Sequence, residues 1–532
     1  MIIRSVRPET IALIVLSVGL VAYDATRASM MSITHDEAAT YIWHVSGRIC
    51  DILYFTTPGL PDNNHLLLTL LSKLSTWLFG NSEFAIRLPS VLSLALFCTA
   101  MAGILRRHLR GPLLVFFFLF TTLNPYLIDM MSIARGYGLG IALATSGLFC
   151  LMRAVEPDKV PGALPRALWA DMAMVALALA VLAHLSLLLL YVMALVVLLA
   201  VFLLNRWRDI HRQEQGATRI STGRLLRVAA GPAAISILLA PVVLLQVHRL
   251  APRGLLNTEG LTSFFVDTVQ NVVVGSLYLV DTVQKAVVDS LDQNRLTQGV
   301  VAALCVFACL LPIVGLLLLV LPNRVARMTP RARADLTILL TLLLGASVLS
   351  VLQHYLAGVA YLSGRRALLL FPLFSLLCGS IAGACRAGAW PLRWIVLPAL
   401  MAVVLPLTVS FAGSANFYKT KDWADNADTK NMMMDLAELR AEMPDHLTSL
   451  GISWVFEPAI NYYRERDHLT EIKPVDRSGP LGRFDAYYVF VEALPSVARA
   501  NGPMRVLQQY AASGTVLAVP QASPVSLAKS AQ

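Results

Sequence analysis

The chain has 532 residues, of which 57% are hydrophobic and only 14% carry a charged side chain. Soluble globular proteins carry about 25% charged residues, so this composition excludes an ordinary soluble enzyme and indicates a polytopic membrane protein. The net charge of +10 does not indicate a nucleic-acid partner, because the part from Phe411 onward has 12 basic against 14 acidic side chains and the excess lies in the apolar part.

Apolar segments recur along the first 411 residues, each near the length of about 20 residues that crosses a hydrocarbon core of about 30 Å. We predict eleven spans, an odd number that places the two termini on opposite sides, with the first kept as a span and not cleaved as a signal peptide. Only residues 183–186 separate the fifth span from the sixth, so these two form either a tight hairpin or one span with a re-entrant piece. The predicted spans are 8–29, 88–105, 112–128, 137–153, 167–184, 186–204, 228–247, 298–321, 335–354, 367–385 and 393–411.

Lysines and arginines gather in the short loops on one side of these spans, as at 106–110, 205–227 and 324–333. Basic short loops stay in the cytoplasm, which predicts a multi-pass protein of the cytoplasmic (inner) membrane with a cytoplasmic N-terminus. The loop after the first span and the C-terminal part then lie outside the cytoplasm.

The first outward loop, about 30–87, has the pattern of helices that lie along a membrane surface. We predict a short helix over 38–49, a turn-rich break at 56–62 and a second helix over 65–79 that ends at Gly80. A second outward loop, about 248–297, is expected to contain one or two more surface helices within 262–289.

The composition changes after residue 411, which divides the chain into a membrane domain, 1–411, and an extracytoplasmic domain, 412–532. The second domain is predicted to be a small α/β domain, and its last dozen residues a disordered tail. Its predicted helices are 435–443 and 458–466, its predicted strands are 452–456, 471–475 and 486–491, and the segment 507–512 then leads into 515–519. Seven cysteines lie almost all in apolar segments, so neither a disulfide framework nor a zinc site is indicated.

Two adjacent carboxylates, Asp36 and Glu37, follow the first span within Thr34-His35-Asp36-Glu37-Ala38-Ala39-Thr40-Tyr41. Because desolvating a carboxylate near a bilayer is costly, such groups indicate a task, such as accepting a proton or holding a cation. The alternative is two solvated loop acids or charges at a helix N-terminus.

Two further motifs share the order and spacing of a known family. They are Phe79-Gly80-Asn81-Ser82-Glu83-Phe84-Ala85-Ile86-Arg87-Leu88-Pro89-Ser90 and Ala134-Arg135-Gly136-Tyr137. With the acidic pair they resemble the GT-C superfamily of polytopic glycosyltransferases, in particular the branch with protein O-mannosyltransferases and lipid A aminoarabinose transferases. The resemblance covers residues 8–155, and the later spans by topology alone.

This resemblance implies transfer of a sugar from a polyprenyl-phosphate donor to an acceptor hydroxyl on a lipid, a glycan or a protein, at the outer face of the membrane. The family's acidic position maps onto Asp36, which is the predicted base, and a base near the attacking oxygen favours inversion. Glu37 is grouped with it as a catalytic candidate that orients a neighbour or completes a cation site. A divalent cation is compatible with the motif but not required, and no other cofactor is indicated.

Outward arginines are the candidates for the donor phosphate, because arginine can pair with phosphate through two hydrogen bonds. Arg87 and Arg135 lie at outward ends of spans, where a membrane anchor or an ion pair such as Glu83 with Arg87 is the alternative. Arg365 and Arg366 are adjacent on the outward side, against the usual charge bias. Three more residues of these motifs complete the predicted donor site: His65, Glu83 and Tyr137.

His65 is followed by Leu66 and Leu67, where many relatives carry prolines, so its role as a ligand, a sugar contact or a helix start stays open. In the C-terminal domain, Tyr462-Tyr463-Arg464 resembles a helix segment of the family and is expected to pack that domain. Two other classes remain: a transporter or flippase of lipid-linked sugars, and a non-catalytic subunit that keeps the fold. A transporter should place ionisable residues deep in its spans, whereas here they cluster at one face, which favours chemistry at the interface.

Overall fold

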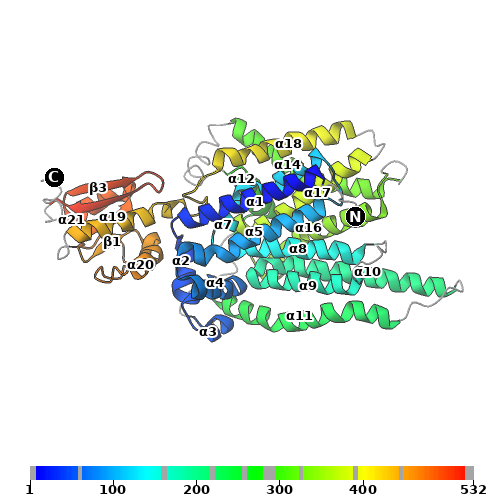
Figure 1. The fold of residues 1–532 in the computed structure, drawn as a ribbon, viewed down its shortest axis with the longest axis horizontal. Coiled ribbons are helices and arrows are strands. Elements are labelled where there is room, and N and C mark those ends of the chain that lie inside the picture. The colour runs from blue at the N-terminus through cyan, green and yellow to red at the C-terminus, as the bar shows by residue number, and fades with distance from the viewer. Residues whose placement is uncertain are drawn as a thin grey trace, which may run out of the picture.

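The computed structural model describes residues 7–57, 63–156, 165–214, 222–254, 260–278, 295–322, 327–387, 393–442 and 447–521. It has two parts, a long helical bundle and a small domain with a β-sheet beyond one end of that bundle (Figure 1). The predicted fold class, a polytopic helix bundle with a small C-terminal α/β domain, is confirmed.

Within the described residues, ten helices are long and apolar enough to cross a membrane, or eleven if one bent pair is a single span. Their positions follow the apolar segments because only a helix satisfies every backbone hydrogen bond within one segment in hydrocarbon. The bundle helices are α1 (Pro8–Met30), α5 (Glu83–Leu105), α6 (Pro112–Thr122), α7 (Pro125–Ser132), α8 (Gly136–Val155), α9 (Arg166–Ala183), α10 (Leu188–Glu214), α11 (Thr222–Leu250), α14 (Arg295–Val320), α16 (Pro330–Ala357), α17 (Leu370–Ala387) and α18 (Arg393–Ser414).

Two predicted spans need comment. The span predicted at 112–128 is broken into α6 and α7, which meet at an angle of 59°. The break has a local cause, because the Asn124 side chain caps α7 by accepting from the amide of Leu127, and Pro125 occupies the first helical position. The fifth and sixth spans are a true hairpin, since α9 and α10 are joined only by His184 and a 3₁₀ turn, η3 (Leu185–Leu187).

Glycines let α8 approach its neighbours closely. A Cβ atom on Gly136 would lie 1.9 Å from the carbonyl oxygen of Ala183, and one on Gly140 would lie 2.5 Å from the Leu187 side chain. Larger side chains at these positions would force the helices apart. The first turn of α8 therefore lies against the connection between α9 and α10.

The first outward loop is folded into four short elements: α2 (His35–Thr40), η1 (Tyr41–Val45), α3 (Ile49–Tyr54) and α4 (Leu66–Phe79). The helix predicted from residue 38 in fact begins at His35, because Thr34 forms a capping box with Glu37. The second predicted helix is confirmed as α4, and it ends at Gly80, whose φ is 82°. Its outer side carries exposed apolar side chains, among them Trp77, as expected for a helix at a membrane surface.

Part of the second outward loop is also helical, as η4 (Ala251–Arg253), η5 (Phe265–Gln270) and α12 (Asn271–Ser276). The rest of the surface helices predicted within 262–289 lies outside the described residues, as does most of the turn-rich break at 56–62 and the predicted disordered tail.

The C-terminal domain is built on a four-stranded sheet in the order β1-β2-β4-β3. β1 (Leu450–Ile452) pairs in parallel with β2 (Ala486–Phe490), whereas β4 (Thr515–Pro520) pairs antiparallel with both β2 and β3 (Met504–Tyr510). Figure 1 shows α19 (Thr429–Glu442), α20 (Glu457–Arg466) and α21 (Leu494–Asn501) around this sheet.

Two predicted strands of this domain are wrong in part or whole. The strand predicted at 452–456 ends at Ile452 and continues as a 3₁₀ turn, η8 (Trp454–Phe456), that leads into α20. The segment 471–475 is not a strand, because it runs past α20, where Asn461 bonds the amide and carbonyl of Val475 in place of a neighbouring strand. Helix α21 was not predicted, and α18 runs three residues beyond the predicted domain boundary.

Candidate functional site

The first turn of α2 sends its two carboxylates in different directions, since consecutive helical residues diverge by about 100°. Glu37 is fully buried and accepts from Arg87 Nε at 2.8 Å and Nη2 at 2.7 Å, and from the amides of Ala134 at 2.6 Å and Thr34 at 3.0 Å. Burial alone would raise the pKa of Glu37, but the Arg87 guanidinium and these hydrogen bonds lower it. Glu37 is therefore an ionised interior group without access to a substrate.

Arg87 is equally enclosed. Besides Glu37, its guanidinium donates to the carbonyl oxygens of Ala28, Met31 and Ser32, so each of its five N–H groups has an acceptor. Its exposed fraction is 0%. The prediction that Arg87 faces a donor cavity is corrected, because its donors are consumed in joining α1, α2 and α5.

Asp36 points to the other side and stays 17% exposed. Its Oδ2 lies 3.2 Å from Arg135 Nη2 and 3.5 Å from Arg365 Nη2, and Arg365 Nε donates to the Tyr137 hydroxyl at 3.1 Å. The four side chains come from α2, the first residues of α8 and η6 (Gly364–Leu369), the 3₁₀ turn that leads into α17. The structure therefore brings together Asp36, Arg135, Tyr137 and Arg365, which we call the outward site.

The electrostatics of the outward site keep Asp36 ionised. Burial raises the pKa of its carboxyl, but Arg135 and Arg365, together with His35 and a hydrogen bond from Trp423, outweigh burial and lower the pKa. A carboxylate paired in this way is a weak base until its cations turn to another anion.

His65 lies beside the outward site at the N-cap of α4, with its ring 5.8 Å from that of Tyr137 and 5.2 Å from that of His184. Burial, and then Arg135, hold its pKa well below the usual range of histidine, so its imidazole is neutral. Its Nε2 atom is buried and has no hydrogen-bond partner among the described residues, and the same is true of Arg135 Nε. A neutral imidazole with a spare nitrogen can bond a hydroxyl but cannot act as a cation.

Glu83 lies elsewhere, against the C-terminal domain. Its Oε1 is 2.7 Å from Arg466 Nη1 and 3.1 Å from Lys430 Nζ, and it accepts from the Tyr463 hydroxyl at 3.1 Å. The expectation that Glu83 and Arg87 share a cavity with Asp36 and Arg135 is therefore wrong, and so is the alternative Glu83–Arg87 pair. Tyr463 is buried in α20, and its hydroxyl accepts from the backbone amide of Ile33 at 2.7 Å, which places it at the joint between the first loop and the C-terminal domain.

Sequence reasoning missed two members of the outward site, Asp422 and Trp423, which follow α18. Asp422 Oδ2 lies 3.6 Å from Arg365 Nη1 and accepts from the Tyr126 hydroxyl at 2.9 Å. The Trp423 ring lies 4.7 Å from the Arg365 guanidinium and 6.0 Å from that of Arg135, in cation–π geometry. The available signal was the charged and aromatic run Lys421-Asp422-Trp423 on the outward side, just after the last span.

Two adjoining hollows lie under the outward site. The smaller is lined by Arg365, Arg366, Tyr137, His184 and Ser186. It shares a further three lining residues, Ile141, Leu187 and Leu369, with a larger hollow inside the bundle. Arg365 and Arg366 both line the smaller hollow, and Arg365 Nη2 also lies 3.5 Å from Asp36 Oδ2.

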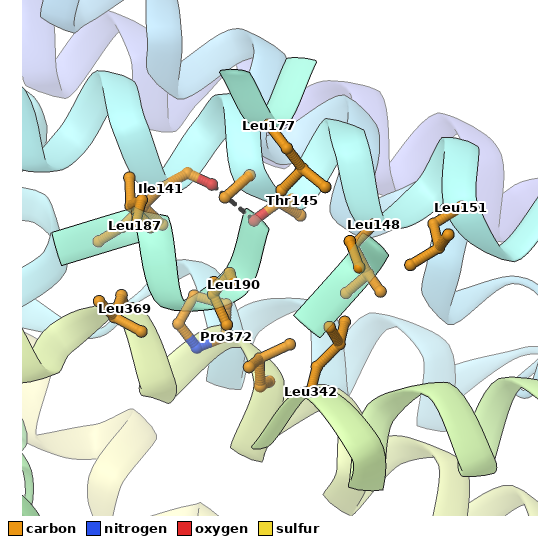
Figure 2. A pocket seen from close by; sticks show the side chains of 13 residues that line it. Ile141, Thr145, Leu148, Leu151, Leu177, Leu187, Leu190, Leu342, Leu369 and Pro372 are labelled. Carbon is orange, nitrogen blue, oxygen red and sulfur yellow. Dashed lines mark hydrogen bonds between the residues drawn. The ribbon is translucent and has the colours of Figure 1, made fainter. Parts of the chain in front are cut away.

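The larger hollow is almost entirely apolar (Figure 2). Leucine, isoleucine, alanine and proline side chains from α8, α9, α10, α16 and α17 line it. The one polar lining residue, Thr145, turns its hydroxyl back to the carbonyl oxygen of Ile141 in its own helix, at 2.8 Å, as the dashed line in Figure 2 shows. An anionic group at Arg365 and Arg366 would lie beside two cations, and an apolar chain in the larger hollow would lie among apolar side chains.

The described residues contain no group of three or more His, Cys, Asp or Glu side chains that could hold a metal ion. Positive charge in the outward site is supplied instead by Arg135 and Arg365.

Comparison with known proteins finds similarity in structure only. No protein-family model matches the chain, and no curated protein matches it. The structure of ArnT from Cupriavidus metallidurans in the apo state is similar over 95% of this chain and 97% of that chain, with 13% identity and a TM-score of 0.43. The same protein bound to undecaprenyl phosphate gives 14% identity and a TM-score of 0.41 over the same shares.

The oligosaccharyltransferase AglB from Archaeoglobus fulgidus, in complex with an inhibitory peptide and a dolichol-phosphate, is similar over 92% of this chain and 71% of that chain. Its identity is 12% and its TM-score 0.43.

Proposed function

We propose that this chain is a membrane glycosyltransferase that moves a sugar from a polyprenyl-phosphate donor to an acceptor hydroxyl. The observation that carries the proposal is the arrangement of three neighbouring environments: an ionised carboxylate, Asp36, beside paired arginines, next to a hollow that shares lining residues with an apolar one. A lipid-linked sugar has the same sequence of parts, which are a reacting carbon, a phosphate and a hydrocarbon chain.

The phosphate binds at Arg365, with Arg366 and Arg135 close by, because these are the cations that line the small hollow or contact Asp36. Arginine suits this task, since its planar guanidinium can bond two phosphate oxygens at once. The polyprenyl chain enters the apolar hollow between α8, α10 and α17, where no side chain offers a free hydrogen-bonding group.

In the transfer step, the acceptor oxygen forms a bond to the anomeric carbon while the bond from that carbon to the phosphate oxygen breaks. Asp36 accepts the acceptor's hydroxyl proton, and polyprenyl phosphate leaves with the electron pair of the broken bond. Attack from the side opposite the leaving phosphate inverts the anomeric carbon. His65 Nε2 and the Tyr137 hydroxyl are placed to bond sugar hydroxyls.

Donor binding activates the base in this scheme. Arg135 and Arg365 now lower the pKa of Asp36, which keeps it ionised but weakens it as a base. When the phosphate takes over part of this positive charge, the pKa of Asp36 rises toward a value better matched to proton transfer. The cations that bind the donor thereby tune the group that activates the acceptor.

In this proposal the outward site faces the extracytoplasmic side of the inner membrane, with the C-terminal domain above it, which the distribution of basic loops supports. The acceptor, whether lipid, glycan or protein, then reaches Asp36 from the side of that domain.

The test uses the purified chain in lipid nanodiscs with a set of labelled polyprenyl-phosphate sugars and extracted envelope material as the acceptor source. We expect the sugar label to move to the acceptor and free polyprenyl phosphate to appear, and both to stop in the Asp36→Asn variant. Asp476→Asn, an exposed carboxylate of the C-terminal domain, is the matched control that should behave as wild type. Passage of intact donor across a sealed bilayer without cleavage would instead identify a transporter.

A further inference from the structure

The segment that follows α18 lies across the outward site and is fixed at several points. We call residues 416–423 the strap. The Tyr23 hydroxyl donates to the carbonyl oxygen of Asn416 at 2.9 Å, and Arg27 Nη2 donates to that of Lys419 at 2.5 Å. The strap is therefore tied to α1 before it reaches the site.

A buried carboxylate on α7 completes this attachment. Asp129 accepts from Arg27 Nη2 at 2.5 Å, from the Tyr278 hydroxyl at 2.9 Å and from the backbone amide of Lys421 at 2.7 Å. The next residue, Asp422, is then held at its side chain by the Tyr126 hydroxyl. The position of the Asp422 carboxylate consequently does not depend on Arg365.

Arg365, by contrast, lies at long distances from its two carboxylate partners, while its Nε donates to the Tyr137 hydroxyl at 3.1 Å. Its two terminal nitrogens lie 3.5 Å from Asp36 and 3.6 Å from Asp422, whereas charge-assisted N–H···O bonds measure about 2.7–2.9 Å. The Arg87–Glu37 pair in the same molecule reaches that shorter range. Arg365 can thus exchange its partners for a phosphate while Asp422 stays in place and remains close to the bound anion.

We propose that Asp422 is a positioning residue that aligns Arg365 in the empty site and weakens the hold of Arg365 on the polyprenyl phosphate product, so that the product leaves. This rests on the proposed function. The donor is a phosphodiester with one negative charge, whereas the product is a phosphate monoester with a second pKa of about 6 and a charge near −2 at neutral pH. Arginines alone would therefore hold the product more tightly than the donor.

The fixed Asp422 carboxylate behind Arg365 lowers the affinity for the product more than the affinity for the donor. Its repulsion of the dianionic product is about twice its repulsion of the monoanionic donor at equal distance. Asp422 faces Tyr126 from α7 and Arg365 from η6, and through Arg365 it shares a cation with Asp36. Removing its charge should therefore retain the product and slow turnover without weakening donor binding.

The experiment is a titration of the full chain in nanodiscs with undecaprenyl phosphate, at pH 7.5 and at pH 5. We expect Asp422→Asn to lower the Kd by about tenfold at pH 7.5 and by only about threefold at pH 5, where the probe loses one charge. Asp422→Glu should bind as wild type, and so should the Asp476→Asn control. In turnover, Asp422→Asn should lower kcat and leave donor KM unchanged or lower.

Equal or weaker binding by Asp422→Asn, or a gain that is the same at both pH values, overturns the role of Asp422. If Asp422→Asn does not fold, Asp422→Ser is titrated with the same expectation and the same criterion. An Arg365→Ala variant, titrated in the same way, distinguishes failure of the Asp422 role from failure of the proposed donor site. Absence of probe binding by wild type, or unchanged binding by Arg365→Ala, contradicts the proposed donor site itself, whatever Asp422 does.

Discussion

Asp36 and Glu37 are neighbours in sequence, and each pairs with arginine, yet the two pairs differ in nearly every physical respect. Glu37 and Arg87 are both fully buried, their atoms meet at 2.7–2.8 Å, and every guanidinium N–H has an acceptor. Asp36 keeps some exposure, its arginines lie at 3.2 and 3.5 Å, and Arg135 Nε has no hydrogen-bond partner within the part of the chain that the structure describes. The first pair is complete without a ligand, and the second has capacity left for one.

This difference separates a structural role from a functional one more sharply than residue type does. Breaking a saturated buried pair leaves an uncompensated charge in the interior, so its loss should appear as instability. A loose pair at the edge of a cavity can change partners at small cost, so its loss should appear in binding and turnover. The predictions below test whether the two neighbouring carboxylates divide in this way.

The largest effect is expected at Asp36. Asp36→Asn removes the base and little volume, so transfer should fall by about 10²–10⁴-fold while expression and the thermal unfolding midpoint stay close to wild type. Initial rates with a labelled polyprenyl-phosphate sugar and thermal unfolding in detergent are the two measurements. Near wild-type turnover would show that Asp36 is not the base.

The reverse pattern is expected for the buried pair. Arg87→Ala should lower the free energy of unfolding by about 3–5 kcal/mol, because Glu37 is left buried without its cation. The double variant Glu37→Gln with Arg87→Met, which removes both charges, should recover part of this loss. A stable Arg87→Ala protein with a raised donor KM would instead return Arg87 to the donor site.

Arg365 should affect donor binding. Arg365→Ala should raise donor KM about ten- to hundredfold, the equivalent of about 1.5–3 kcal/mol for a charge-assisted contact. Lysine should restore only part of this, since it cannot form the planar double contact. Arg366→Ala should act in the same direction, because Arg366 also lines the hollow. Unchanged KM in both alanine variants would move the phosphate to Arg135.

The smallest effect is the pH dependence. Because the pKa of Asp36 is lowered, the base is ionised above its pKa and activity is lost only as the pH falls through it, which predicts an acid limb below about pH 4. The pKa values of His65 and His184 lie well below the usual range, so neither imidazole should gain a proton between pH 5 and 8. A profile of kcat/KM with a limb near pH 6–7 would contradict the assignment of a neutral histidine beside the site.

The sequence alone determined the parts of this protein that depend on local physics. Hydrocarbon thickness and backbone hydrogen bonding fix span length, so each predicted span falls on a helix, except that 112–128 is broken into α6 and α7, and Gly80 ends α4 where predicted. The position of Asp36 just after the first span and its proximity to Arg135 also followed from topology, since both lie at outward ends of spans. Short strands were less predictable, because the segment at 471–475 is held by α20 and not by a neighbouring strand.

Only the tertiary structure decided which charged groups are paired and which are open. Nothing in the motif order shows that Glu37 and Arg87 are saturated while Asp36 and Arg135 are not, because this depends on carbonyl groups at the end of α1 and an amide before α8 that surround one pair alone. Asp422 and Trp423 reach the outward site only because Arg27 and Asp129 hold the strap there. Burial and the number of hydrogen-bond acceptors around a guanidinium are set by contacts between residues far apart in the chain, and local sequence carries no information about them.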